Sequence, residues 1–116
     1  MKIERINTTP RWSDATIYNG IAHFVEIAAD EDADIVGQIK QVFEQADQTL
    51  ALIGSNNSRL LSVTIYLKEL QYLQLFNDMW EAWLPEGSAP SRACLKAELV
   101  DPRLLVEITF IAAVIE

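Results

Sequence analysis

The sequence predicts an α+β fold, in which a mostly antiparallel six-stranded sheet carries two helices on one of its faces. Runs with apolar residues at every second position alternate with two stretches of helical period, which gives the element order βββαβαββ. Half of the 116 residues are hydrophobic, enough for a real core. The chain has the length of one domain and shows no linker or repeat, so we expect a single domain over residues 1–116.

The first third of the chain predicts three strands. Residues 1–7 favour a short first strand, and the polar residues 8–14 favour a loop. Asn19-Gly20 lies between two apolar runs, and this dipeptide is a strong signal for a two-residue hairpin turn. Residues 14–29 are therefore expected to form a strand, a tight turn and a second strand.

Residues 30–54 predict the first helix. Its apolar residues recur every three or four positions and so share one helical face: Ile35, Ile39, Val42, Ala46, Leu50 and Ile53. The acidic residues at its start suit the positive end of the helix dipole. Gly54 is a suitable stop.

The middle of the chain adds a strand and the second helix. Residues 59–70 alternate, and the strand is expected to turn Leu61, Val63, Ile65 and Leu67 to one side. Residues 71–84 return to helical spacing, with an apolar face that contains Trp80 and Trp83. Proline and glycine in residues 85–91 end this helix.

The last third predicts two strands, over residues 91–99 and 103–115, separated by an Asp101-Pro102 turn. We expect them to be antiparallel neighbours. The small and apolar residues of the first of these strands should face the helices: Ala93, Leu95, Ala97 and Leu99. The opposite face of the sheet is half-apolar, which suits contact with another subunit better than bulk water.

Composition excludes several classes of function. Nine Lys and Arg residues against 17 Asp and Glu residues leave a net charge of −8 and no basic cluster, so a nucleic-acid surface is not expected. One cysteine and one histidine provide neither a disulfide framework nor metal-ligand spacing. No segment resembles a signal peptide or a membrane span. We therefore expect a cytoplasmic protein without a bound metal.

Two single charges stand out in the last two strands. Arg92 opens the first of them, and Glu107 lies in a run that is otherwise apolar except for Thr109. An isolated buried carboxylate is costly, so Glu107 should have a water, a donor or a cation nearby. In an antiparallel pair, Arg92 and Glu107 would be roughly 10 to 13 Å apart, which leaves room for a small molecule. The alternative is that Arg92 solvates a strand end and that Glu107 is a surface charge.

These residues belong to motifs that resemble the RidA/YjgF family, also called L-PSP proteins. "PSRAC", a strand, a proline turn and "LLVEITFIAA" are similar to that family's C-terminal signature. Residues 62–84 resemble its strand, turn and Asn-containing helix, with Lys68-Glu69-Leu70 and Asn77 in the matching places. "RWSD" resembles the YoaB-like branch. The likeness covers nearly the whole chain and is most specific in the last third.

The resemblance implies a YjgF-like, chorismate-mutase-like fold and a homotrimer with a cleft between each pair of subunits. It implies hydrolysis of reactive 2-enamines and 2-imino acids, such as 2-aminoacrylate, to 2-keto acids and ammonia, without a cofactor. Arg92 would bind the substrate carboxylate bidentately. Glu107 would hold the attacking water and move protons. The backbone of Cys94 would contact the ligand.

Two departures from the family pattern bear on the predicted site. Trp12 stands in the loop where many members carry a pocket tyrosine, and Val25-Glu26-Ile27 replaces a glycine-containing strand end. Trp12, Phe24 and Glu26 are thus candidate substrate-binding residues, although Glu26 would repel an anion if it pointed inward. The alternative functions are non-catalytic binding of a small carboxylate and, against the acidic charge balance, endoribonuclease activity.

Overall fold

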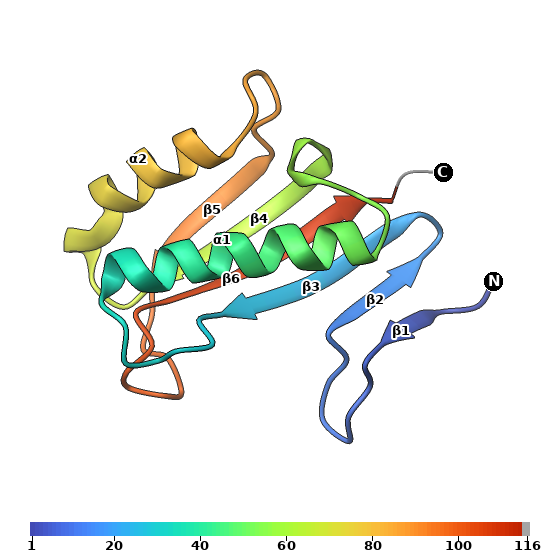
Figure 1. The fold of residues 1–116 in the computed structure, drawn as a ribbon, viewed down its shortest axis with the longest axis horizontal. Coiled ribbons are helices and arrows are strands. Elements are labelled where there is room, and N and C mark those ends of the chain that lie inside the picture. The colour runs from blue at the N-terminus through green and yellow to red at the C-terminus, as the bar shows by residue number, and fades with distance from the viewer. Residues whose placement is uncertain (115–116) are drawn as a thin grey trace.

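The computed structural model describes residues 1–114, in which one six-stranded sheet carries both helices on the same face (Figure 1). The strands are β1 (Glu4–Ile6), β2 (Ala15–Tyr18), β3 (Ile21–Ile27), β4 (Leu60–Leu67), β5 (Ser91–Lys96) and β6 (Val106–Ala113), and the helices are α1 (Ile35–Leu52) and α2 (Leu73–Trp83). The spatial strand order is β1-β2-β3-β6-β4-β5. This confirms the predicted α+β class and element order. None of the helices in this part of the chain has the length and apolarity that a membrane crossing needs.

The Asn19-Gly20 hairpin is confirmed. Strands β2 and β3 are antiparallel, with Tyr18 opposite Ile21, and the two residues between them have φ angles of 53° and 76°. A two-residue turn with both φ angles positive matches the right-handed twist of the strands that it joins. Glycine adopts this conformation without strain, and asparagine adopts it more readily than most residues.

The predicted pairing of the last two strands is wrong. β5 does not contact β6; it lies at the edge of the sheet, parallel to β4, while β6 is antiparallel to both β3 and β4. The reason is that α2 forms a crossover from β4 to β5, which brings the two strands side by side in the same direction. The C-terminal strand then fills the centre of the sheet, where its nearly continuous apolar run is buried. Its predicted end at residue 115 lies outside the described residues.

Two expectations about strand faces are also wrong. Ala93 and Leu95 point away from the helices, whereas Cys94 packs against the core on the helix face. β5 is an edge strand in which every residue except Cys94 is exposed, so the pattern of small and apolar residues did not reveal which side faces the helices. In β4, a register shift between Leu60 and Ser62 turns Leu61 outward, where it is 45% exposed. The other three residues of the predicted face, Val63, Ile65 and Leu67, are buried as predicted.

The core lies between the helix face of the sheet and the two helices. The predicted apolar face of α1 is buried except for Ile35, which is only partly covered. Aromatic rings stack within each layer: Phe24 on Phe110 across β3 and β6, with centroids 4.8 Å apart, and Phe43 of α1 on Trp83 of α2 at 4.5 Å. Offset stacking of this kind adds to the stabilisation that burial provides. The edge-on pair of Trp83 and Phe110, with centroids 6.3 Å apart, joins the two layers.

The predicted stop of α1 at Gly54 is confirmed, whereas the helix begins at Ile35, after the acidic residues that the prediction placed at its start. Asp34 caps the N-terminus, since its Oδ1 accepts a hydrogen bond of 2.8 Å from the backbone N–H of Gly37. Gly54 follows the last turn with a φ of +77°, a conformation that favours glycine.

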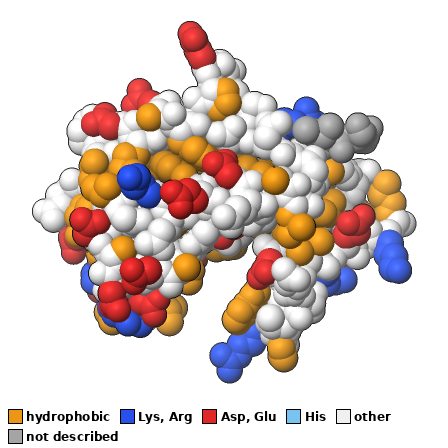
Figure 2. All heavy atoms as spheres, viewed as in Figure 1, with side chains coloured by type: hydrophobic (Ala, Val, Ile, Leu, Met, Phe, Trp, Pro, Cys, Tyr) orange, Lys and Arg blue, Asp and Glu red, His pale blue; other side chains and the backbone are white. Residues whose placement is uncertain are grey.

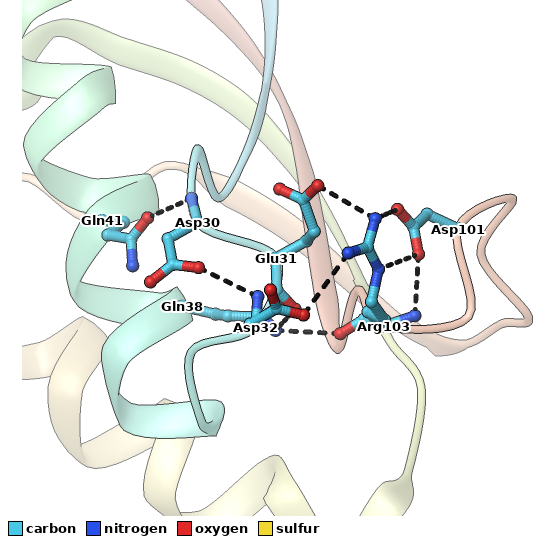
Figure 3. Close-up of polar contacts among 7 residues, drawn as sticks. All are labelled: Asp30, Glu31, Asp32, Gln38, Gln41, Asp101 and Arg103. Atoms are coloured by element: carbon cyan, nitrogen blue, oxygen red, sulfur yellow. Dashed lines mark hydrogen bonds and ion pairs between the residues drawn. The ribbon is translucent and has the colours of Figure 1, made fainter.

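Three glutamines of α1 hold the loops at one end of the sheet, and Figure 3 shows two of them, Gln38 and Gln41. Gln38 is fully buried; its Nε2 donates to the carbonyls of Ala33 and Arg103, and its Oε1 accepts from the N–H of Leu105 at 2.8 Å. The other two glutamines bind the segment before α1: Oε1 of Gln45 accepts a hydrogen bond from the N–H of Ala29, and Oε1 of Gln41 accepts one from the N–H of Asp30. Helix α1 is therefore tied both to the end of β3 and to the start of β6.

Arg103 forms ion pairs with three acidic side chains beside Gln38 (Figure 3). Its guanidinium lies 2.9 Å from both Glu31 and Asp101 and 3.4 Å from Asp32. The Arg103 side chain is half exposed, and exposed ion pairs contribute only about 0 to 1 kcal/mol to stability. The buried glutamine is therefore the stronger tie between the two loops.

The face of the sheet opposite the helices is uncovered in the single chain. It exposes apolar side chains such as Val25 and Leu95, which are 53% and 46% exposed. It also carries a hollow of about 330 Å³ around His23, Thr16 and Thr109. This half-apolar surface has the character that the sequence predicts for the second face.

Candidate functional site

Arg92 lies at the free edge of the sheet, held by α2. Its Cζ atom is 5.6 Å from the ring centroid of Trp80 and 5.9 Å from that of Phe76, within the range of cation–π attraction. Its Nη2 donates a hydrogen bond of 2.6 Å to Oδ1 of Asn77. The side chain remains exposed, and Nε and Nη1 make no hydrogen bond within residues 1–114. The guanidinium is thus fixed in orientation and keeps donors for a ligand.

The backbone of Cys94 faces outward beside this guanidinium. Ala97 donates its N–H to the carbonyl of Leu67 in β4, and backbone groups point alternately to the two sides of a strand. Three residues earlier, the N–H and C=O of Cys94 therefore point away from the sheet. The thiol itself is turned towards the core, and burial raises its pKa. A raised pKa keeps the thiol protonated, so the backbone rather than the sulfur is available for a ligand.

Glu107 lies on the opposite face of the sheet from Arg92. It is half-buried in β6, in a row with Tyr66 of β4 and Leu95 of β5. This row borders a hollow of about 320 Å³ that Tyr66, Glu107, Thr109 and the segment after β5 line. β4 separates β6 from β5, so a single chain does not bring Glu107 and Arg92 together.

The other three predicted site residues lie in three different places. Trp12 is 60% exposed in the β1–β2 loop, where its backbone hydrogen-bonds to Thr9. Phe24 is buried in the core against Phe110. Glu26 points towards α1, where it accepts hydrogen bonds from Thr49 at 2.8 Å and from Gln45 at 3.3 Å. Their contact with a ligand stays a prediction.

The environment of Glu26 gives a pH-dependent prediction. Burial raises the pKa of its carboxyl above the ordinary value of 4.5, although the hydrogen bonds from Thr49 and Gln45 oppose this. The folded protein therefore holds the proton more tightly than the unfolded chain, and its stability falls as pH rises from about 4.5 through the raised pKa. We expect Glu26→Gln to increase the melting temperature at pH 7 and to leave it nearly unchanged at pH 4.

Thermal unfolding of both proteins from pH 4 to pH 8 measures this difference. Glu44→Gln is the matched control, because Glu44 is an exposed carboxylate on α1, the helix that Glu26 contacts. A Glu26→Gln variant that is less stable than the wild type at pH 7 would show that the hydrogen bonds outweigh burial.

Sequence reasoning missed the residues that support Arg92. Asn77 stands out in the sequence only as part of the family resemblance, and Phe76 and Trp80 only as core. The signal that was available is their spacing, since positions i, i+1 and i+4 of α2 place an amide beside two aromatic rings. Without the parallel pairing of β5, nothing in the sequence places Arg92 over that part of the helix.

Comparisons with known proteins find relatives that match nearly the whole chain. The family described as Endoribonuclease L-PSP matches residues 2–114. RutC family protein YoaB of Escherichia coli K12 is 37% identical over 114 residues, which cover 98% of this chain and 100% of YoaB. The crystal structure of a YjgF family member from Neisseria meningitidis superposes with a TM-score of 0.94 at 32% identity, over 100% of this chain and 98% of the other.

A protein of Pseudomonas aeruginosa gives a second close structural match. It has a TM-score of 0.94 and 36% identity, over 98% of this chain and all of the other. Sequence and fold therefore agree along the full length of the chain. The chain belongs to the RidA/YjgF family, whose members are also called L-PSP or RutC family proteins, and it is similar to YoaB from end to end.

Proposed function

We propose that this protein hydrolyses reactive 2-enamines and 2-imino acids to 2-keto acids and ammonia, with Arg92 as the carboxylate anchor. The observation that supports this most directly is the fixed, exposed guanidinium on Asn77 and the aromatic rings of α2. A guanidinium that is held in one orientation binds a planar carboxylate with two parallel hydrogen bonds. The substrate class is therefore a small molecule with a carboxylate beside its reactive carbon.

The proposed reaction needs only water and proton transfers. An enamine such as 2-aminoacrylate first gains a proton at C3 and loses one from its nitrogen, which gives the 2-imino acid. Water then adds to C2, which converts the C=N bond to a single bond, and one proton moves from the water to the nitrogen. The remaining hydroxyl proton passes to the nitrogen as the C–N bond breaks, which releases ammonia and leaves the C=O of the 2-keto acid. The outward backbone of Cys94 would orient the imine, since its C=O can accept the imine N–H.

Glu107 would act on a substrate that Arg92 of a neighbouring subunit holds. The two residues lie on opposite faces of the sheet in one chain, so a shared ligand requires two subunits. The uncovered, half-apolar sheet face that carries Glu107 suits such a contact. We propose that a homotrimer places this face of one subunit against the β5 edge of the next, where the carboxylate holds the attacking water.

Turnover is tested with 2-aminoacrylate formed in situ by a serine dehydratase. Semicarbazide traps the imine as it forms, so hydrolysis competes with trapping. We expect the purified protein to increase the yield of pyruvate and to decrease the yield of the trapped product in proportion to its concentration. If no 2-imino acid in a panel of small and large side chains is hydrolysed faster, the proposal fails.

The second candidate function is binding of a small carboxylate without turnover. The separation of Glu107 from Arg92 favours it, because a guanidinium alone binds a carboxylate but activates no water. It predicts that a 2-keto acid such as pyruvate raises the melting temperature while the trapping assay shows no effect. Acceleration in that assay would reject this candidate.

A further inference from the structure

A third hollow lies at the C-terminal end of α2 and shares Trp80 with the surroundings of Arg92. Its volume is about 390 Å³. Helix α2 and the loop before β5 line it with Trp80, Glu81, Leu84, Pro85, Glu86, Gly87 and Ala89. Neither the resemblance to the family nor the proposed reaction uses this hollow.

Trp80 connects this hollow with the carboxylate anchor, because it lines the hollow and also contacts Arg92. Asn77 and Trp80 contact the guanidinium of Arg92, while Trp80 and Leu84 line the hollow. Positions i, i+3 and i+7 share a side of a helix, and one turn advances about 5.4 Å. A substrate that is held by its carboxylate at Arg92 thus has space for its side chain beside the same tryptophan.

The chemistry of the hollow selects a particular side chain. Trp80, Leu84 and Pro85 provide apolar surface, and Glu81 and Glu86 provide exposed carboxylates. Among the described residues 1–114, no lysine or arginine lines the hollow. Acidic side chains lie over α2 and at the tip of the loop after it (Figure 2). An extended side chain with an apolar stem and a positive end complements this lining.

We propose that this hollow is the side-chain subsite and that it prefers 2-imino acids whose long side chain ends in a cation, as oxidation of basic amino acids produces. The proposal rests on the proposed function, because Arg92 orients the substrate. Glu81 and Glu86 determine specificity and take no part in the hydrolysis, so they should change the choice between substrates rather than the chemistry.

The test compares two substrates of the same shape and different charge. A broad-specificity L-amino-acid oxidase converts arginine and citrulline to their 2-imino acids, and semicarbazide trapping measures hydrolysis of each. We expect kcat/KM for the arginine-derived imine to exceed that for the citrulline-derived imine by about fivefold, the size of one partly exposed ion pair. The ratio should fall towards one in high salt, because exposed charges are screened.

Variants connect this preference with the hollow. The double variant Glu81→Gln/Glu86→Gln should bring the ratio close to one and leave hydrolysis of 2-aminoacrylate unchanged. Glu44→Gln, on the exposed side of α1, removes a charge elsewhere and should leave the ratio as it is. Ala89→Phe fills the hollow and should slow both large substrates while sparing 2-aminoacrylate.

The outcomes separate the two proposals. If the wild type hydrolyses both large imines equally well, or if the double variant keeps the preference, the side-chain subsite is wrong and the proposed reaction stands. If no imine is hydrolysed at all, the proposed function fails, and the subsite fails with it.

Discussion

Replacement of Arg92 by alanine is expected to reduce kcat/KM for 2-aminoacrylate by about 100-fold or more, since two charge-assisted hydrogen bonds to the substrate carboxylate are lost. The melting temperature and the oligomeric state should change little, because the guanidinium is exposed and, within residues 1–114, Asn77 is its one hydrogen-bond partner. The trapping assay measures the first quantity, and thermal unfolding with gel filtration measures the others. Loss of activity in a folded protein would place Arg92 in the site.

Two further variants make this test specific. Arg92→Lys keeps the charge but loses the planar guanidinium that makes two parallel hydrogen bonds, so its activity should lie between those of the wild type and the alanine variant. Lys96→Ala removes a cation from the same strand, four residues on, and should have little effect. If Lys96→Ala reduced activity as strongly as Arg92→Ala, general positive charge along β5 would be responsible, and the fixed anchor would be wrong.

Replacement of Gln38 by methionine is expected to lower the free energy of unfolding by about 2 to 4 kcal/mol, because methionine has a similar size but cannot replace the hydrogen bonds of the amide. The N–H of Leu105 and the carbonyls of Ala33 and Arg103 would then lack their partner. Denaturant unfolding measures the loss. Few single substitutions in a chain of this size should cost more.

The matched control is Gln48→Met. Gln48 is an exposed residue of the same helix, so its replacement should change stability by less than about 0.5 kcal/mol. Equal effects at the two positions would mean that the helix propensity of the new residue, and not the buried hydrogen bonds, causes the loss.

The elements that depend on local signals were predicted correctly from the sequence. Gly54 follows the last turn of α1, and Asn19-Gly20 forms the hairpin, because a helix stop or a tight turn depends on the conformation of one or two residues. The period of the apolar residues identifies the face of α1 that is buried. Each of these signals lies within a few residues of the structure that it determines.

Predictions that depend on strand neighbours were wrong where the chain makes a crossover. Strands that follow one another along the chain are often neighbours in the sheet, and this tendency favours a β5–β6 pair. The structure instead inserts β6 between β3 and β4, as the nearly unbroken apolar run of residues 104–113 suggests for a central strand. The predicted pairing placed Glu107 on the strand next to Arg92, whereas β4 lies between their strands in the structure.

The buried glutamine was missed for a different reason. Gln38 lies three residues after Ile35 and four before Val42, so its position is on the apolar face of α1, but glutamine is a residue type that is mostly exposed. Its burial depends on the loop that contains Arg103, which is 65 residues away in the sequence. A partner that distant leaves no local pattern.

The glutamines of α1 also determine how the protein should respond to its solvent. An amide side chain neither gains nor loses a proton in the range where proteins work, and it carries no net charge for salt to shield. Low pH or high salt should weaken the ion pairs of Arg103 with its carboxylates but leave the hydrogen bonds of the three glutamines intact. The end of the sheet at which β3 stops and β6 begins should therefore remain ordered under conditions that remove the surface ion pairs around it.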